Sequence, residues 1–226
     1  MLHSTYAHKE TNEDPKTSAI FENLLLLPEN ICWAILREAC SEGSELPVVS
    51  GRLLEYEFWP HWNPEGTRNQ SFVEPDLFLR FQQFDVVIEA KYGDSAGQDK
   101  EQWEREVTSY YNEYEDDAKT LVFIAVGGNT SKCKESVNGK GHKVDVYRCT
   151  WESILLAVSH YEENLRRLAL CDYSVEAQKR TVANIILAFN INGIYNMEWF
   201  GSLWKNHYNL SQSSITSLYN YFNYGK

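Results

Sequence analysis

Two short apolar segments in the middle of the chain predict a β-hairpin. Leu77–Phe81 and Phe84–Ala90 are rich in branched and aromatic residues, and only the polar pair Gln82-Gln83 separates them. In the second segment, apolar residues alternate with positions that include acidic residues, so one face is wholly apolar and the other carries charge. The pattern therefore predicts two antiparallel strands that bury a face in a core.

The register of that hairpin brings three charged side chains together. A two-residue loop places Asp76 directly opposite Glu89, and Lys91 shares their face because side chains alternate with a period of two. Two opposed carboxylates repel each other unless a cation lies between them. Carboxylate oxygens are ligands that Mg²⁺ prefers, so the pattern predicts a magnesium site in which Mn²⁺ can substitute. A salt-bridged, half-exposed hairpin face is the alternative.

Acidic residues two positions before a lysine recur elsewhere in the chain. Asp14 precedes Lys16 and Asp117 precedes Lys119 in the same way, and we expect both to be solvated surface pairs. Only the pair at Glu89 follows an apolar run and has a Pro-Asp upstream in pairing register. The prediction therefore depends on the apolar run and the upstream Pro-Asp, and not on the spacing of Glu89 and Lys91 alone.

The rest of the chain predicts an α/β fold. Further strands are expected at 52–59, 121–126 and 143–147, and helical segments at 18–40, 98–114, 151–156 and from 175 onward. This order places a helix before the hairpin and a helix after it. A central mixed β-sheet flanked by helices is the architecture that this order favours.

The residues Pro75-Asp76 and Glu89-Ala90-Lys91, together with the order of elements, resemble the PD-(D/E)XK phosphodiesterase superfamily, the restriction-endonuclease-like nucleases. The resemblance covers roughly residues 18–160. It implies a restriction-endonuclease-like core with a mixed β-sheet. It also implies that Asp76 and Glu89 hold the metal, that Lys91 is the catalytic lysine and that the substrate is nucleic acid.

The resemblance implies two further site residues. Many members carry a metal-facing Glu on the first helix, and Glu22, which opens an apolar run, is preferred here over Glu29 and Glu38. Members also carry a Gln on the helix after the lysine. Gln98 and Gln102 lie four residues apart on one helical face, and Gln102 is the better match for a catalytic role. Ordinary exposed helix residues are the alternative for each position.

The charge balance limits how the chain could hold nucleic acid. Asp and Glu number 32 against 21 Lys and Arg, which gives a net charge of −11, whereas nucleic-acid binders usually present a basic footprint. Candidate phosphate contacts lie between two expected strands, unless that segment is only a solvated loop: Lys132, Lys134, Lys140 and Lys143. A more basic protein partner could hold the nucleic acid instead.

Composition sets the remaining limits. No apolar run is long enough to span a membrane, and the N-terminus lacks the apolar core of a signal peptide, so we expect a cytoplasmic protein. Five cysteines without a C-x-x-C pair argue against a disulfide framework or a zinc cluster. We expect a polar lead at 1–17, a nuclease-like domain at 18–173 and a helical extension at 174–226, whose aromatic residues could contact a protein partner.

The expected function is a Mg²⁺-dependent endonuclease that hydrolyses phosphodiester bonds in nucleic acid, with DNA favoured. The resemblance alone suggests a prokaryotic restriction, defence or repair setting, and a homodimer would suit double-strand cleavage. One alternative is a non-catalytic nucleic-acid- or protein-binding module on the same fold, acting as a subunit of a larger complex. Another is an unrelated α/β enzyme, but the sequence contains no nucleophile elbow, Walker loop, dinucleotide-binding loop or zinc-protease motif.

Overall fold

The expected hairpin lies at the centre of the structure, a computed structural model that describes residues 14–92, 97–128, 133–168 and 173–195. Strands β2 (Leu77–Phe81) and β3 (Phe84–Ala90) pair antiparallel, with Leu77 opposite Ile88, so the predicted register is confirmed. Every residue of β3 is buried. A strand covered on both faces explains this, and it explains the nearly continuous apolar run in the sequence.

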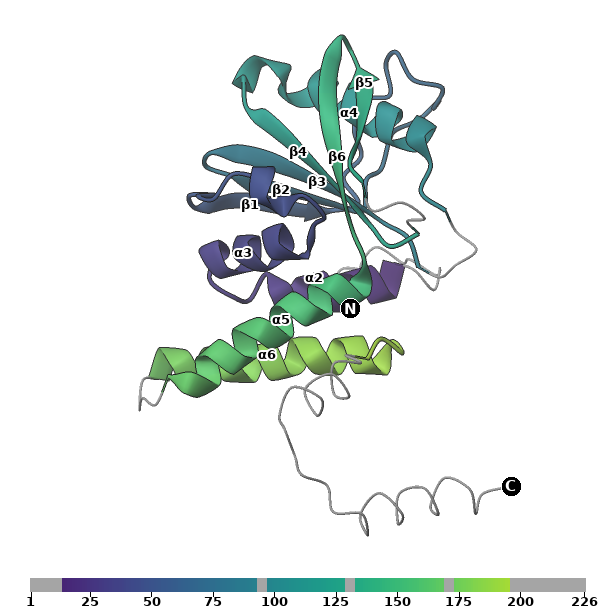
Figure 1. Cartoon of the computed structure of the whole chain (residues 1–226). Coiled ribbons are helices and arrows are strands. Elements are labelled where there is room, and N and C mark those ends of the chain that lie inside the picture. The colour runs from purple at the N-terminus through teal and green to yellow at the C-terminus, as the bar shows by residue number, and fades with distance from the viewer. Residues whose placement is uncertain (1–13, 93–96, 129–132, 169–172, 196–226) are drawn as a thin grey trace, which may run out of the picture. The chain divides into compact units, whose positions relative to one another are not determined.

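Six strands form an open mixed sheet in the order β1-β2-β3-β4-β6-β5 (Figure 1). Strand β1 (Leu53–Phe58) pairs antiparallel with β2, whereas β4 (Thr120–Val126) and β6 (His142–Cys149) continue from β3 in parallel. Strand β5 (Glu135–Gly139) forms the far edge, antiparallel to β6. This last strand was expected as a loop, because Val137 is the only branched apolar residue among its five.

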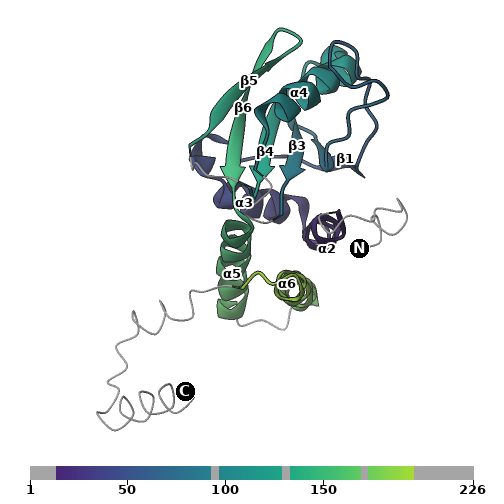
Figure 2. The ribbon, with the colours of Figure 1, turned by 90° about the vertical axis from the view of Figure 1, so that its right-hand side faces the viewer.

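One face of the sheet is covered by α4 (Lys100–Tyr114), as Figure 2 shows. The helix begins after Asp99, whose side chain accepts a hydrogen bond of 2.9 Å from the main-chain N–H of Glu101 and so caps the N-terminus. Its apolar residues Trp103, Val107 and Tyr110 recur at helical spacing and are buried against the sheet.

The opposite face is covered by α2 (Asp14–Leu24), α3 (Glu29–Ala39) and α5 (Trp151–Arg167). A single helix was expected across 18–40, but the chain turns between Leu24 and Glu29. Pro28, the N-cap of α3, has no N–H to continue the first helix. Two short 3₁₀ turns, η1 (Gly43–Glu45) and η2 (Glu115–Asp117), follow α3 and α4.

Helix α6 (Tyr173–Ile191) packs on α2 and α5 and buries Val182, Ile185 and Phe189 in the same core. The first of two compact units extends over Met1–Tyr195. The segment 174–195, expected in an extension, packs in the same unit as the sheet, and α2 begins inside the expected polar lead. The partner surface expected at 196–226 lies outside the described residues. None of the described helices is both long and apolar enough to cross a membrane.

Candidate functional site

Asp76, Glu89 and Lys91 meet at the carboxyl end of β3. The Oδ2 atom of Asp76 accepts a 2.7 Å hydrogen bond from the main-chain N–H of Ala90, between the other two residues. The Nζ atom of Lys91 donates to Oε1 of Glu89 and forms an ion pair with it. The structure thus brings together the three charges that the register predicted, at the edge of the sheet where α/β proteins with parallel strands usually bind ligands.

The main chain at Lys91 is fixed by tight packing against β4 and α5. Its N–H donates to the carbonyl of Val126 (2.8 Å), and its carbonyl accepts from the indole of Trp151 (2.9 Å). Gly127 has φ +66°, and a Cβ there would lie 2.2 Å from the carbonyl oxygen of Lys91. Glycine is therefore required at this position, and the backbone of Lys91 has little room to move.

Both candidate glutamines of α4 contact β3, in different ways. The amide of Gln102 donates to Oε1 of Glu89 at 2.7 Å, so this residue touches the candidate metal ligand itself. The amide of Gln98 lies within 3.1–3.3 Å of the main-chain carbonyls of Glu89, Val126 and Gly127. Gln98 therefore joins the ends of β3 and β4, and Gln102 lies where the preferred glutamine was expected.

Glu106 is the acidic residue that the sequence reasoning missed. It lies one turn after Gln102 on α4 and is 1% exposed, and its polar neighbours are Gln102 and Glu89, although neither contact has full hydrogen-bond geometry. Its carboxyl group lies against that of Glu89. Spacing alone could have found it, because residues four apart share a helical face, but a polar residue at a buried position has no distinct signal in one sequence.

The electrostatics of the cluster are dominated by burial. Burial raises the pKa of Asp76, Glu89 and Glu106, and the charge of Glu89 raises the pKa of the other two further. Lys91 opposes the rise at Glu89. Burial alone would lower the pKa of Lys91, but the neighbouring carboxylates more than offset this, so its pKa is raised. The cluster therefore contains three carboxyl groups and one ammonium group, that of Lys91, so a bound cation would be electrostatically favourable there.

The donor set fits a hard divalent cation. The carboxyl oxygens of Asp76 and Glu89, in a cluster that has more carboxyl groups than ammonium groups, are ligands of the kind that Mg²⁺ and Mn²⁺ prefer. Within the described ranges, no three His, Cys, Asp or Glu side chains are arranged to hold one metal ion. A cation here would therefore use these two carboxylates and complete its coordination with water and substrate oxygens.

The three first-helix glutamates lie in different surroundings. Glu22 accepts a hydrogen bond from Ser18 and lines a cavity between α2 and α6. Glu38 pairs with His160 of α5 at 2.7 Å, and Glu29 lines another cavity. Among the charges that raise the pKa of Asp76, α2 contributes Asp14 instead. The metal-binding role assigned to Glu22 stays a prediction.

The candidate phosphate contacts are dispersed over the β5–β6 hairpin. Lys134 pairs with Glu45 and lies 3.4 Å from Asp145, and Lys140 lies 2.7 Å from Glu115. Glu89 is level with Arg148 in the parallel register, so Lys143 lies roughly 17 Å away along β6. Lys132 lies outside the described residues. Two of these lysines are therefore partly neutralised by the protein's own carboxylates.

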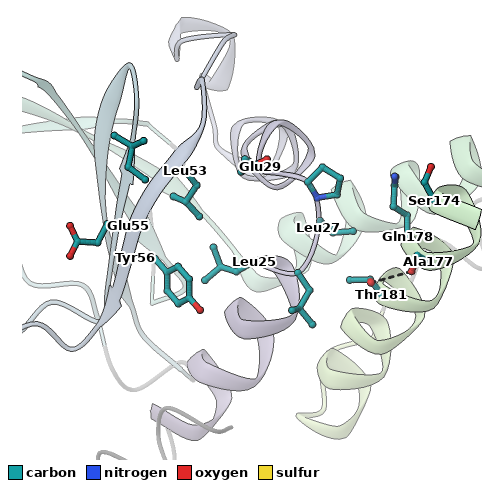
Figure 3. Close-up of a pocket in the computed structure, with 13 residues that line it drawn as sticks. Leu25, Leu27, Glu29, Leu53, Glu55, Tyr56, Ser174, Ala177, Gln178 and Thr181 are labelled. Atoms are coloured by element: carbon teal, nitrogen blue, oxygen red, sulfur yellow. Dashed lines mark hydrogen bonds between the residues drawn. The ribbon is translucent and has the colours of Figure 1, made fainter.

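A cavity of about 710 Å³ lies away from the cluster, between the α2–α3 turn, β1 and α6 (Figure 3). Its lining is mainly leucine and other apolar or neutral side chains, including Leu25, Leu53, Tyr56 and Ala177. This cavity therefore offers no cluster of carboxylates and lysine comparable to the one at the end of β3.

Comparisons with known proteins assign no family to this chain. No protein-family model matches the sequence, and no curated protein matches it either. Among solved structures, the chain is similar to part of a tetradecameric assembly of Thermococcus gammatolerans McrB AAA+ hexamers with bound McrC, at 14% identity and a TM-score of 0.25. The match covers 58% of this chain and 28% of that chain, and a likeness this low carries no argument.

Proposed function

We propose that this chain is a divalent-cation-dependent endonuclease of the restriction-endonuclease-like type, with DNA as the favoured substrate. The observation that carries the proposal is the convergence of Asp76, Glu89 and Lys91 at the carboxyl end of β3, with Lys91 paired to Glu89. The order of elements supports it: helices, three antiparallel strands, α4 and the parallel strand β4 follow one another as the resemblance implies. A restriction, defence or repair setting follows from the resemblance alone.

Each residue of the cluster has a role in this proposal. Asp76 and Glu89 would hold the cation, which supplies Lewis acidity and lowers the pKa of a bound water. Lys91 would place its ammonium beside a phosphate oxygen and stabilise the negative charge that develops there. Gln102 would keep Glu89 oriented through its hydrogen bond. Together these groups are suited to the hydrolysis of a phosphodiester.

A second candidate is a catalytic or binding subunit that depends on a basic partner to hold nucleic acid. The net charge of −11 favours this arrangement, as do the pairs that Lys134 and Lys140 form with Glu45 and Glu115. A protein that neutralises its own lysines has less positive charge to offer to phosphates. The first candidate hydrolyses nucleic acid on its own, whereas the second requires the basic partner.

The test is cleavage of linear, supercoiled and single-stranded DNA and of RNA, in Mg²⁺, Mn²⁺ and EDTA. We expect wild-type protein to cut at least one substrate only with a divalent cation, Asp76→Ala to fall to background, and Lys91→Ala to lose about 10²–10³-fold in rate. Lys100→Ala, an exposed lysine at the start of α4, is the matched control and should retain activity.

The same variants separate the alternatives. Absence of cutting together with absence of Mn²⁺ binding by calorimetry would contradict the metal-dependent nuclease. Mn²⁺ binding that requires Asp76, without cutting on any substrate, would favour the subunit that needs a partner.

A further inference from the structure

The carboxylate of Asp76 is held by protein donors at both oxygens. Its Oδ2 accepts from the main-chain N–H of Ala90 at 2.7 Å, and its Oδ1 accepts from the indole Nε1 of Trp59 at 3.3 Å. The main-chain N–H of Trp59 also donates to the carbonyl of Asp76, at 3.2 Å. Trp59, the residue that follows β1, therefore contacts Asp76 through both of its donors.

The backbone of Trp59 is in an unfavourable conformation. Its φ is +51°, in the left-handed region that residues with bulky side chains rarely adopt. The other described non-glycine residues with positive φ are Glu42, Ala118 and Lys140, and all three are exposed beside turns. Trp59 is instead only 6% exposed. A strained backbone at a buried residue persists only where the surroundings fix it, and such positions cluster at functional sites.

We propose that Trp59 is a positioning residue of the cation site, which fixes the carboxylate of Asp76 in the orientation that binds the divalent cation. This inference rests on the proposed function. A neutral N–H donor suits the role because it orients a metal ligand without adding positive charge that would compete with the cation. Ala90 holds one oxygen from β3 and Trp59 holds the other from β1, so both neighbouring strands set the direction of the ligand.

The experiment compares Mn²⁺ affinity by calorimetry in wild type, Trp59→Phe and Trp62→Phe, with Asp76→Ala as the blank. Trp59→Phe keeps the main-chain donor and most of the buried ring and removes the indole N–H. Trp62 is the matched control, because it is 3% exposed and packs against Phe78 with ring centroids 5.3 Å apart. We expect the Kd for Mn²⁺ to rise about tenfold in Trp59→Phe and to stay within about twofold in Trp62→Phe.

The outcomes separate this inference from the proposed function. Equal affinity in wild type and Trp59→Phe would overturn the positioning role and leave the cation site intact. Absence of binding by wild type, or equal binding by Asp76→Ala, would overturn the cation site itself and the inference with it.

A measurement on wild-type protein keeps the inference testable if Trp59→Phe does not fold. Tb³⁺ bound at Asp76 would lie beside the indole of Trp59, whereas Trp151 contacts the site only at the carbonyl of Lys91, so excitation of tryptophan should give sensitised Tb³⁺ emission that Asp76→Ala loses and Trp151→Phe keeps. Tb³⁺ binding by calorimetry without sensitised emission would contradict the placement of Trp59 at the ion.

Discussion

Two buried carboxylates on the same face of β3 have opposite surroundings. Asp85 lies near the start of the strand and Glu89 four residues later, and both are at most 1% exposed. Asp85 accepts from the hydroxyl of Tyr110 at 3.0 Å and from Nζ of Lys119 at 3.1 Å, and Arg80 lies 3.9 Å away. Asp85 is therefore surrounded by donors and positive charge.

Glu89 has donors as well, but also acidic neighbours. Lys91 and Gln102 donate to it, whereas its charge raises the pKa of Asp76 and Glu106, and the charge of Asp76 raises the pKa of Glu106 further. The same strand thus carries one carboxylate whose charge is compensated by the protein and one whose cluster has an excess of acid. A compensated buried carboxylate is typical of structural networks, while an excess of buried carboxyl groups indicates a site that binds a cation.

The largest expected effect is on stability, and it separates the two positions directly. We expect Asp85→Asn to lower the free energy of unfolding by about 3 kcal/mol, because it leaves Lys119 and Arg80 facing a neutral group in a buried network. Glu89→Gln should change it by no more than about 1 kcal/mol in EDTA, since losing the pair with Lys91 is offset by relief of repulsion. Urea unfolding at neutral pH measures both.

The control for this prediction is the cation. Saturating Mn²⁺ should stabilise Asp85→Asn as much as it stabilises wild type, and it should not stabilise Glu89→Gln. Equal destabilisation by the two substitutions would mean that Glu89 belongs to a structural ion-pair network like that of Asp85.

A smaller effect is expected at Glu106, a buried carboxyl group that lies against the carboxyl group of Glu89. Glu106→Gln should raise the free energy of unfolding by about 1 kcal/mol at neutral pH in EDTA, because an amide can donate to Glu89 without a proton being taken up. Glu104→Gln, on the same helix and half-buried, is the matched control and should change it by less than about 0.5 kcal/mol. Destabilisation by Glu106→Gln would contradict this account of the cluster.

The pH dependence follows from the same group. Burial and the charge of Glu89 raise the pKa of Glu106 in the folded protein above its unfolded value. The folded state then binds the proton more strongly, so this contribution to stability is complete below the unfolded pKa of about 4.3 and is lost as pH rises through the folded pKa. Glu106→Gln should flatten the fall of stability as pH rises above the unfolded pKa of about 4.3, measured by urea unfolding in EDTA.

The sequence predicts the parts of the fold that repeat over several residues. The apolar runs in 77–90 indicate β2 and β3, and the two-residue loop between them gives their register, which the alternation of faces supports. Strand β5 and the break at Pro28 were missed. Strand β5 contains one branched apolar side chain, Val137, which is too weak a pattern to predict a strand. The apolar residues on both sides of Pro28 favoured one continuous helix, although the proline ends it.

The site was predictable where its residues are neighbours across a hairpin. The convergence of Asp76, Glu89 and Lys91 follows from strand pairing, whereas Gln102 was found through the resemblance, with helical spacing placing it on the same face as Gln98. Trp59 and Glu106 could not be predicted in this way. The position of Trp59 depends on a left-handed backbone conformation, and that of Glu106 on the packing of α4 over β3, and neither produces a pattern in the sequence. The expected surface pair of Asp117 and Lys119 was also wrong for Lys119, which is half-buried and bonds to Asp85.

The smallest expected effect on stability is at Asp117, at the exposed edge of the network around Asp85. Asp117 pairs with Arg80, but its side chain is 44% exposed, so water can replace the pair. We expect Asp117→Asn to lower the free energy of unfolding by less than about 0.5 kcal/mol and to leave the Mn²⁺ affinity unchanged, whereas Glu89→Gln should abolish Mn²⁺ binding. Urea unfolding and calorimetry on the two variants give both readings. A change in Mn²⁺ affinity in Asp117→Asn would show that the two ends of β3 are electrostatically coupled, and the distinction between a compensated network and a cation site would then fail.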